Sequence, residues 1–177
     1  MVFEELVEGN ITRFAAIFHS RNVTDIGPVR SARTGDFELL SNLNTPLFGN
    51  SGGNPTVMRL LDEVDMILVG DTNVGRAAYR RNDERSAPYN LMTGTGEIYA
   101  AADGRGGTPP QMFSYRNIDE SLPPSAQPVD GIDIDYGGYQ ITYRWDDVFQ
   151  GWARTQQGSA HVAVSYTHLT LPTILLV

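Results

Sequence analysis

Residues 46–70 carry the pattern that most restricts the fold of this chain. Asn54-Pro55 stands where a helix begins, because asparagine caps a first turn and proline is tolerated at the first helical position. Apolar residues then recur at helical spacing: Val57, Leu60, Leu61 and Val64. A short strand over 47–48 precedes the helix, and a buried strand over 65–69 follows it. Residues 46–70 therefore predict a strand–helix–strand unit whose two strands run parallel.

Two further patterns precede this unit. The apolar runs 1–8 and 13–19 are joined by Gly9-Asn10, which is a two-residue hairpin signal. A helix is then expected to begin with Ser31 as its cap and to run to about Leu43. Its apolar face would consist of three residues: Phe37, Leu40 and Leu43.

The second half of the chain changes from helices to strands. A helix is expected over 95–102, and glycine- and proline-rich loops follow it. Three strands come next: 131–135, 139–145 and 149–154. The fold class is therefore α/β, a mixed sheet with flanking helices, followed by a strand-rich β segment. We expect a truncated first domain over 1–128 and the start of a strand-rich second domain over 129–163.

Residues 164–177 differ from the rest of the chain. Apart from His168, they contain no acidic or basic residue, whereas Asp, Glu and Arg are frequent before them. The string Val164–Thr173 resembles the translation of a transposase-type sequencing adapter. We therefore expect residues 164–177 not to be native and leave them out of the fold reasoning. Because Met1 opens directly on a strand pattern, we expect a fragment that is cut at both ends.

Composition restricts the classes of function. The chain has 13 basic and 21 acidic residues, a net charge of −8 at pH 7. This balance argues against a nucleic acid as partner, because a basic face is the usual footprint of such proteins. All basic residues are arginine, which either a GC-rich genome or selection for the guanidinium group explains. The lack of cysteine excludes disulfides and thiolate chemistry.

The first candidate site combines two arginines with a glycine-rich loop. Arg30 and Arg33 stand at the expected start of a helix, where the backbone dipole is already positive and a cationic side chain is unfavourable. Residues that go against such a local preference tend to mark functional positions. Between a strand and a helix lies a loop of the kind that holds anions. Its candidate ligand-binding residues are Ser51, Gly52, Gly53 and Asn54. The alternatives are a plain turn for the loop, and ion pairs with Glu5, Glu8 or Asp36 for the arginines.

A second candidate lies in the segment 85–91. Pro88 stiffens this loop and Asn90 can bond the nearby backbone, so that Arg85 would be held facing a ligand. Arg85 and Asn90 are therefore added to the candidate ligand-binding residues. A surface turn that leads to the next helix is the competing interpretation.

Other chemical classes receive little support from the sequence. The chain has no Gly-x-Ser-x-Gly nucleophile elbow, and its histidines lack ligand-spaced partners, so neither a metal site nor a cofactor is expected. Asp133 and Asp135 share one face of a strand, which suits either a hard cation or solvated carboxylates. The aromatic residues Tyr143, Trp145 and Trp152 suit either a binding platform or cross-strand packing.

Five motifs give the chain a family resemblance. They are Glu5–Gly9, Ile11–Arg13, Gly27–Arg33, Ala87–Leu91 and Ile132–Tyr136. Together they resemble the YerB-like lipoproteins of bacteria, over nearly all residues from 2 to about 163. The resemblance implies two tandem domains of unknown function in an extracytoplasmic protein. It also implies membrane attachment only through a lipidated cysteine upstream of this fragment.

Three functions are compatible with these observations. The first, which we favour, is a non-catalytic envelope module that binds an anionic cell-envelope ligand or an envelope protein through the candidate residues. The second is an envelope phosphotransferase acting on a wall-polymer or polyprenyl phosphate. It would need a divalent metal, for which Asp36 is the best carboxylate. The third is a structural scaffolding lipoprotein in which the arginines only form ion pairs.

Overall fold

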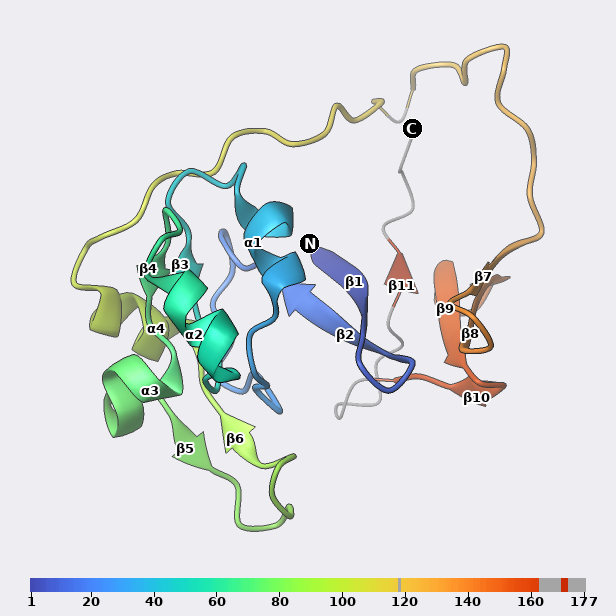
Figure 1. Cartoon of the computed structure of the whole chain (residues 1–177). Helices are drawn as coiled ribbons and strands as arrows, with labels where there is room; N and C mark the ends of the chain where they lie inside the picture. The colour runs from blue at the N-terminus through green and yellow to red at the C-terminus, as the bar shows by residue number, and fades with distance from the viewer. Residues whose placement is uncertain (118, 163–169, 172–177) are drawn as a thin grey trace. The chain divides into compact units, whose positions relative to one another are not determined.

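The computed structural model describes the whole chain except residues 118, 163–169 and 172–177 (Figure 1). The described residues form two compact units. Unit 1 comprises Met1–Glu5 and Phe14–Pro110, and unit 2 comprises Leu6–Arg13 with the described residues from Gln111 onward. The domain boundary expected after residue 128 stays a prediction. The expectation that residues 164–177 are foreign concerns mainly residues outside the described part.

The strand–helix–strand prediction for unit 1 is confirmed. Strand β3 (Leu47–Phe48) pairs in parallel with β4 (Ile67–Leu68), and helix α2 (Pro55–Leu61) connects them. The Asn54 side chain accepts a 2.9 Å hydrogen bond from the amide of Val57, as expected of a cap. The apolar face of α2 is buried through Val57 and Leu61. Figure 1 shows α2 beside this strand pair. The α/β class is thereby established for this unit.

The helix expected from Ser31 to Leu43 is shorter than predicted. Helix α1 spans Thr34–Leu40, with Arg33 as the cap residue. The backbone amide of Arg33 donates a 2.7 Å hydrogen bond to the buried carboxylate of Asp36. Ser31 does not cap the helix because the backbone on either side of it bonds the loop around Ser51: the Arg30 carbonyl accepts from the Ser51 amide, and the Ala32 amide donates to the Gly52 carbonyl. Leu40 and Leu43 are nevertheless buried.

The remaining elements of unit 1 follow β4. They are α3 (Asp71–Val74), a 3-10 turn η1 (Gly75–Ala77), β5 (Arg80–Arg81), β6 (Leu91–Met92) and α4 (Thr95–Ala102). Strands β5 and β6 are antiparallel, and Ile26 bridges to Thr93 just after β6. Ala78, Tyr79 and Leu91 form a buried hydrophobic cluster. The helix predicted over 95–102 is confirmed. No helix among the described residues has the length and apolar character needed to cross a bilayer.

The amino-terminal hairpin is also confirmed. Strands β1 (Val2–Val7) and β2 (Ile11–Ala16) pair with one another. Gly9 and Asn10 have positive φ values of 81° and 56° in the connection. Such values are required at both central residues of a type I′ turn, and glycine and asparagine adopt them at low cost.

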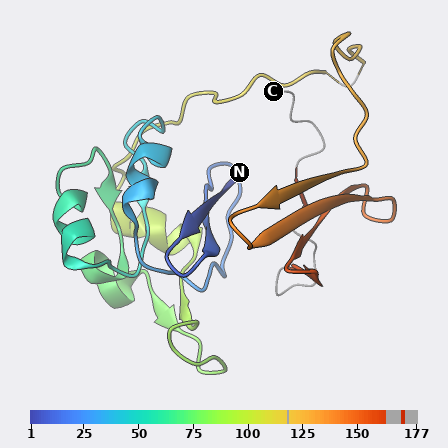
Figure 2. The ribbon, with the colours of Figure 1, turned by 45° about the vertical axis from the view of Figure 1, so that its right-hand side comes forward.

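Unit 2 is an antiparallel sheet. Its strands are β7 (Gly131–Asp135), β8 (Gln140–Asp146), β9 (Gly151–Gln156), β10 (Ser159–Ala160) and β11 (Thr170–Leu171). The order is β10-β9-β8-β7, and β11 also pairs with β9. The long orange strands β7 and β8 lie side by side in Figure 2. Ile141, Tyr143 and Arg154 are buried. Trp145 and Trp152 lie opposite one another and pack edge to face, 5.8 Å between ring centroids. Cross-strand packing therefore accounts for these tryptophans.

Candidate functional site

The loop from β3 to α2 uses much of its polar capacity to fix its own shape. The side-chain Oδ1 of Asn50 accepts a 2.8 Å hydrogen bond from the amide of Gly52, whose φ is 94°. The Ser51 amide donates 3.0 Å to the Arg30 carbonyl. Asn54, as described, caps α2 through its side chain. The amides of Ser51 and Gly52, two of the predicted donors to an anion, thus already have acceptors in the protein.

Asn50 links this loop to the end of β4. It is 2% exposed, and its backbone carbonyl accepts a 2.7 Å hydrogen bond from the amide of Asp71. A Cβ on Gly70 would lie 2.9–3.0 Å from three Asn50 atoms, so only glycine lets the two segments come this close. The side-chain Nδ2 of Asn50 has no hydrogen-bond partner among the described residues. The carboxyl ends of the parallel strands are therefore joined tightly to each other.

Tyr79, a member of the buried cluster with Ala78 and Leu91, contacts the residue that follows β4. Its ring is 4% exposed, and its hydroxyl donates a 2.7 Å hydrogen bond to the carbonyl of Val69. Burial raises the pKa of the phenol well above its usual range, and the negative charge of Asp71 raises this pKa further. The folded chain consequently keeps the Tyr79 proton at a pH where the unfolded chain has lost it.

This difference predicts an effect of Tyr79→Phe that depends on pH. The stability that Tyr79 contributes is complete below about pH 10, the ordinary tyrosine pKa, and is lost as the pH rises above it. At about pH 8 the variant is expected to lose about 1 kcal/mol, the value of the hydrogen bond to Val69. Between about pH 8 and about pH 11 its free energy of unfolding should fall less than that of the unaltered chain.

Urea unfolding at the two pH values, followed by far-UV circular dichroism, measures this difference. Tyr99→Phe is the control, because the Tyr99 ring is 40% exposed on α4 and makes no hydrogen bond in the described structure. Equal pH slopes for Tyr79→Phe and the unaltered chain would contradict the prediction.

Arg33 belongs to a local network at the start of α1. Its guanidinium donates to the carbonyls of Ala32 at 3.0 Å and Ser31 at 3.4 Å. A Glu5 carboxylate oxygen lies 2.7 Å from where a Cβ on Gly35 would stand, in the first turn of the same helix. Asp36 is engaged by the backbone amide of Arg33. The carboxylate expected to hold a metal in the phosphotransferase hypothesis therefore serves as a helix cap.

Arg30 extends in a different direction, onto the loop between β5 and β6. Its Nη1 donates a 3.2 Å hydrogen bond to the carbonyl of Pro88, and its guanidinium carbon lies 4.9 Å from the centre of the Tyr89 ring. Arg85 belongs to the same loop, where its amide closes a turn on the Asn82 carbonyl. Within the described part of the chain, neither Arg30 nor Arg85 forms an ion pair. Arg30 thus contacts the loop that carries Arg85.

Asn90 anchors that loop through a partner that the sequence did not indicate. Its side-chain oxygen accepts a 2.9 Å hydrogen bond from Arg81, and Arg81 lies 4.0 Å from the carboxylate of Asp71. Tyr89 was not among the predicted site residues, although it lies within a motif that carries the family resemblance. The available signal was an aromatic residue directly after a loop proline, which is a weak one.

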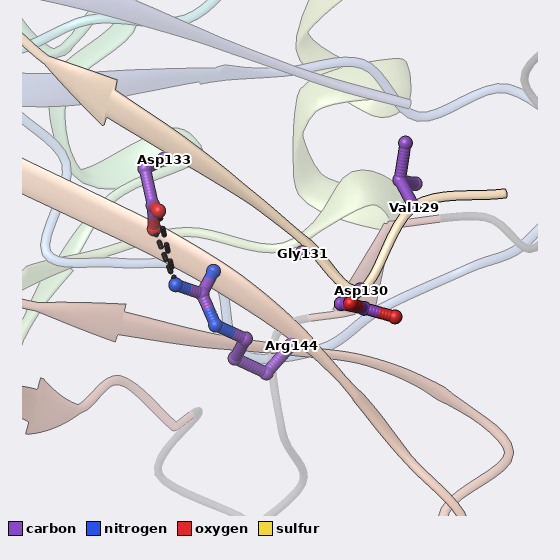
Figure 3. Close-up of a pocket in the computed structure, with 5 residues that line it drawn as sticks. All are labelled: Val129, Asp130, Gly131, Asp133 and Arg144. Carbon is purple, nitrogen blue, oxygen red and sulfur yellow. Dashed lines mark hydrogen bonds and ion pairs between the residues drawn. The ribbon is translucent and has the colours of Figure 1, made fainter. Parts of the chain in front are cut away.

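Unit 2 contains an open pocket of about 350 Å³ on the β7–β8 face (Figure 3). Asp133 forms an ion pair with Arg144 at 2.7 Å, and the Arg144 side chain lies over Gly131. Asp135 instead accepts a 2.6 Å hydrogen bond from the amide of Gly138. Both carboxylates of the cation hypothesis therefore have protein partners. In the described ranges, no group of three or more histidine or acidic residues is arranged to hold a metal ion.

Comparison with known proteins identifies the family. Residues 1–108 match the family described as "Protein of unknown function (DUF3048) N-terminal domain". The chain is 30% identical over 162 residues to a protein of Bacillus subtilis (strain 168) named "Putative lipoprotein YerB". That alignment covers 89% of this chain and 49% of the relative.

A solved structure supports the same relationship. The crystal structure of YerB from Bacillus subtilis superposes with a TM-score of 0.72 at 25% identity, covering 93% of this chain and 56% of that one. The chain thus spans about half the length of the relatives that it matches. The YerB-like resemblance predicted from the five motifs is confirmed, and the chain belongs to the family of the DUF3048 N-terminal domain.

Proposed function

We propose that this chain is part of an envelope-associated binding module that holds the anionic group of an envelope ligand. The binding surface is formed by Arg30, Arg85 and Tyr89, and we call it the β5–β6 surface. The observation that carries the proposal is that Arg30 contacts the loop that carries Arg85, while neither arginine forms an ion pair among the described residues. The envelope location rests on the name of the Bacillus subtilis relative, a putative lipoprotein.

The chemistry of arginine supports an oxyanion as ligand. A guanidinium has five N–H donors in one plane, and Arg30 uses one of its nitrogens on the Pro88 carbonyl. The remaining donors suit the bidentate geometry of a carboxylate or a phosphate. Stacking on Tyr89 holds the Arg30 guanidinium in place, which reduces the entropy lost on binding.

The other predicted residues then have a supporting role. Ser51 holds the backbone of Arg30 through its amide, and Gly52 holds that of Ala32. Arg33 and Asn54 fix the first turns of α1 and α2 on either side of these contacts. Asn90 fixes the end of the β5–β6 loop through Arg81. We therefore assign these residues to positioning the β5–β6 surface.

Thermal unfolding in the presence of pyrophosphate tests the proposal. A ligand at about 100 times its dissociation constant adds about 2.7 kcal/mol to stability. The double variant Arg30→Gln/Arg85→Gln is expected to lose this stabilisation, and the effect in the unaltered chain should weaken as salt is added.

The control is Arg59→Gln/Arg76→Gln, which changes the net charge equally at two exposed arginines of unit 1 that have no side-chain partner in the described structure. Circular dichroism of each variant without ligand verifies folding. The proposal fails if pyrophosphate does not stabilise the unaltered chain. It also fails if the control double variant loses as much stabilisation as Arg30→Gln/Arg85→Gln.

A further inference from the structure

We infer that the ligand of the β5–β6 surface is an anionic glycan. In this arrangement a sugar ring stacks on Tyr89 while the acidic group of the same or the next sugar binds Arg30 and Arg85. The inference rests on the proposed function and adds the chemical class of the ligand. Its starting observation is the Tyr89 ring, which is 60% exposed although its position is fixed.

Three contacts fix Tyr89. Its amide donates a 2.9 Å hydrogen bond to the Ser86 carbonyl, which closes a turn. The Arg30 guanidinium lies over the ring, and the same guanidinium holds the Pro88 carbonyl one residue earlier. An exposed aromatic ring that is held in this way offers a rigid contact surface at low entropic cost.

The geometry leaves one ring face for a ligand. Arg30 covers one face of Tyr89, and because the residue is still 60% exposed, we expect the other face of its ring to be open to solvent. The faces of an aromatic ring carry negative charge, and the C–H groups of a sugar ring are weakly positive. A sugar ring is flat enough to lie on such a face, and its hydroxyl groups remain free to contact the polar rim.

The surroundings of Tyr89 favour a glycan over an apolar partner. The loop residues 83–89 are exposed apart from the partly buried Arg85, and Tyr89 is the one large apolar side chain exposed between residues 79 and 98. A protein interface with a hydrophobic core needs a larger apolar area than one ring.

Two acidic residues favour a ligand of low charge density. Asp83 and Glu84 precede Arg85 directly and are exposed. Their negative charges repel a polyanion such as polyphosphate, in which every successive phosphate group is charged. An acidic glycan spaces its charges by one or more sugar rings, so that a charge meets the arginines while the acidic residues face neutral hydroxyl groups.

The experiment compares three probes by isothermal titration of the full chain. They are oligogalacturonate, a neutral galactose oligosaccharide of similar length, and a polyphosphate with the same number of charges. We expect oligogalacturonate to bind about tenfold more tightly than either of the other probes. Polyphosphate lacks the ring contact and the neutral oligosaccharide lacks the acidic group, and one such well-placed contact is worth roughly this factor.

Two substitutions separate the contribution of the Tyr89 ring to the affinity from that of the arginines. Tyr89→Phe keeps the ring and is expected to keep the affinity for oligogalacturonate, whereas Tyr89→Leu is expected to reduce it about tenfold to the level of polyphosphate. Pyrophosphate binding by Tyr89→Leu shows whether its arginines still hold an anion.

The outcomes distinguish this inference from the proposed function. If polyphosphate binds as tightly as oligogalacturonate, or if Tyr89→Leu leaves the oligogalacturonate affinity unchanged, the glycan assignment is overturned and the anion site stands. If the neutral oligosaccharide binds as tightly as the acidic one, the assignment of the acidic group is overturned. If none of the three probes and no pyrophosphate binds, both the inference and the proposed function are overturned.

Discussion

Leu61→Ala is expected to lower the free energy of unfolding of unit 1 by about 2–5 kcal/mol. Leu61 is 2% exposed on α2, the helix that connects the parallel strands and begins at the Asn54 cap. Helix α1 packs against α2, and the buried Leu40 and Val57 belong to these two helices. Truncation removes buried methyl groups and leaves a cavity that rigid neighbours fill only in part, so both terms destabilise the unit.

The positions of the helices and tryptophans make this effect measurable in the intact chain. All helices in the described residues lie in unit 1, and both tryptophans lie in unit 2. Urea unfolding followed by far-UV circular dichroism therefore reports mainly on unit 1, while tryptophan fluorescence reports on unit 2. Leu60→Ala is the matched control, because Leu60 is the same residue type in the same helix but is only partly buried. A loss as large for Leu60→Ala as for Leu61→Ala would contradict the packing argument.

Elements with strong local signals were predictable from the sequence. Asn54-Pro55 located the start of α2, since both residues act on the first helical turn itself. Gly9-Asn10 located the β1–β2 hairpin because these two residues form the connection between the strands and adopt its positive φ values. Three strands of unit 2, β7, β8 and β9, lie within two residues of their predicted bounds, because alternating or apolar runs of five to seven residues give a clear period. The two-residue strands β10 and β11 were not predicted.

Elements defined by distant contacts were not predictable. Ser31 was a reasonable cap, but residues 30–32 stay outside the helix because they hydrogen-bond to the loop around Ser51. Strands β5 and β6 have two residues each, which is too short for a periodic pattern. Their positions are set by pairing with one another and by the bridge from Ile26. In each case a partner far along the chain decides the local conformation.

The candidate site likewise combines residues that the sequence indicated with contacts that only the structure provides. Arg30 and Arg85 stand out in the sequence because one breaks a helix rule and the other lies in a stiffened loop, yet their binding role stays a prediction. Arg30 reaches the loop that carries Arg85 only through its contact with Pro88, 58 residues away. Tyr89 had no signal of its own, since its orientation comes from stacking with Arg30.

Arg154→Ala is the second substitution with a large expected effect, about 2–5 kcal/mol on the free energy of unfolding of unit 2. Arg154 is 1% exposed on β9 and is the largest fully buried side chain in the described structure. Its guanidinium bonds the imidazole of His161 and, at 3.2 Å, the side-chain oxygen of Gln156. Truncation leaves a large cavity and removes a donor from both partners. Urea unfolding followed by tryptophan fluorescence measures the loss, because Trp152 lies on the same strand.

Two further variants separate packing from charge at this position. Arg144→Ala on β8 is the matched control, because Arg144 is exposed and its ion pair with Asp133 is expected to contribute less than about 1 kcal/mol. Arg154→Met keeps most of the buried stem and is expected to recover more than half of the loss. Gln156 and His161 are both partly exposed, so that their polar atoms can bond water once the guanidinium is gone. If Arg154→Met is as unstable as Arg154→Ala, the hydrogen bonds of the guanidinium rather than the packing of its stem hold β9 in place.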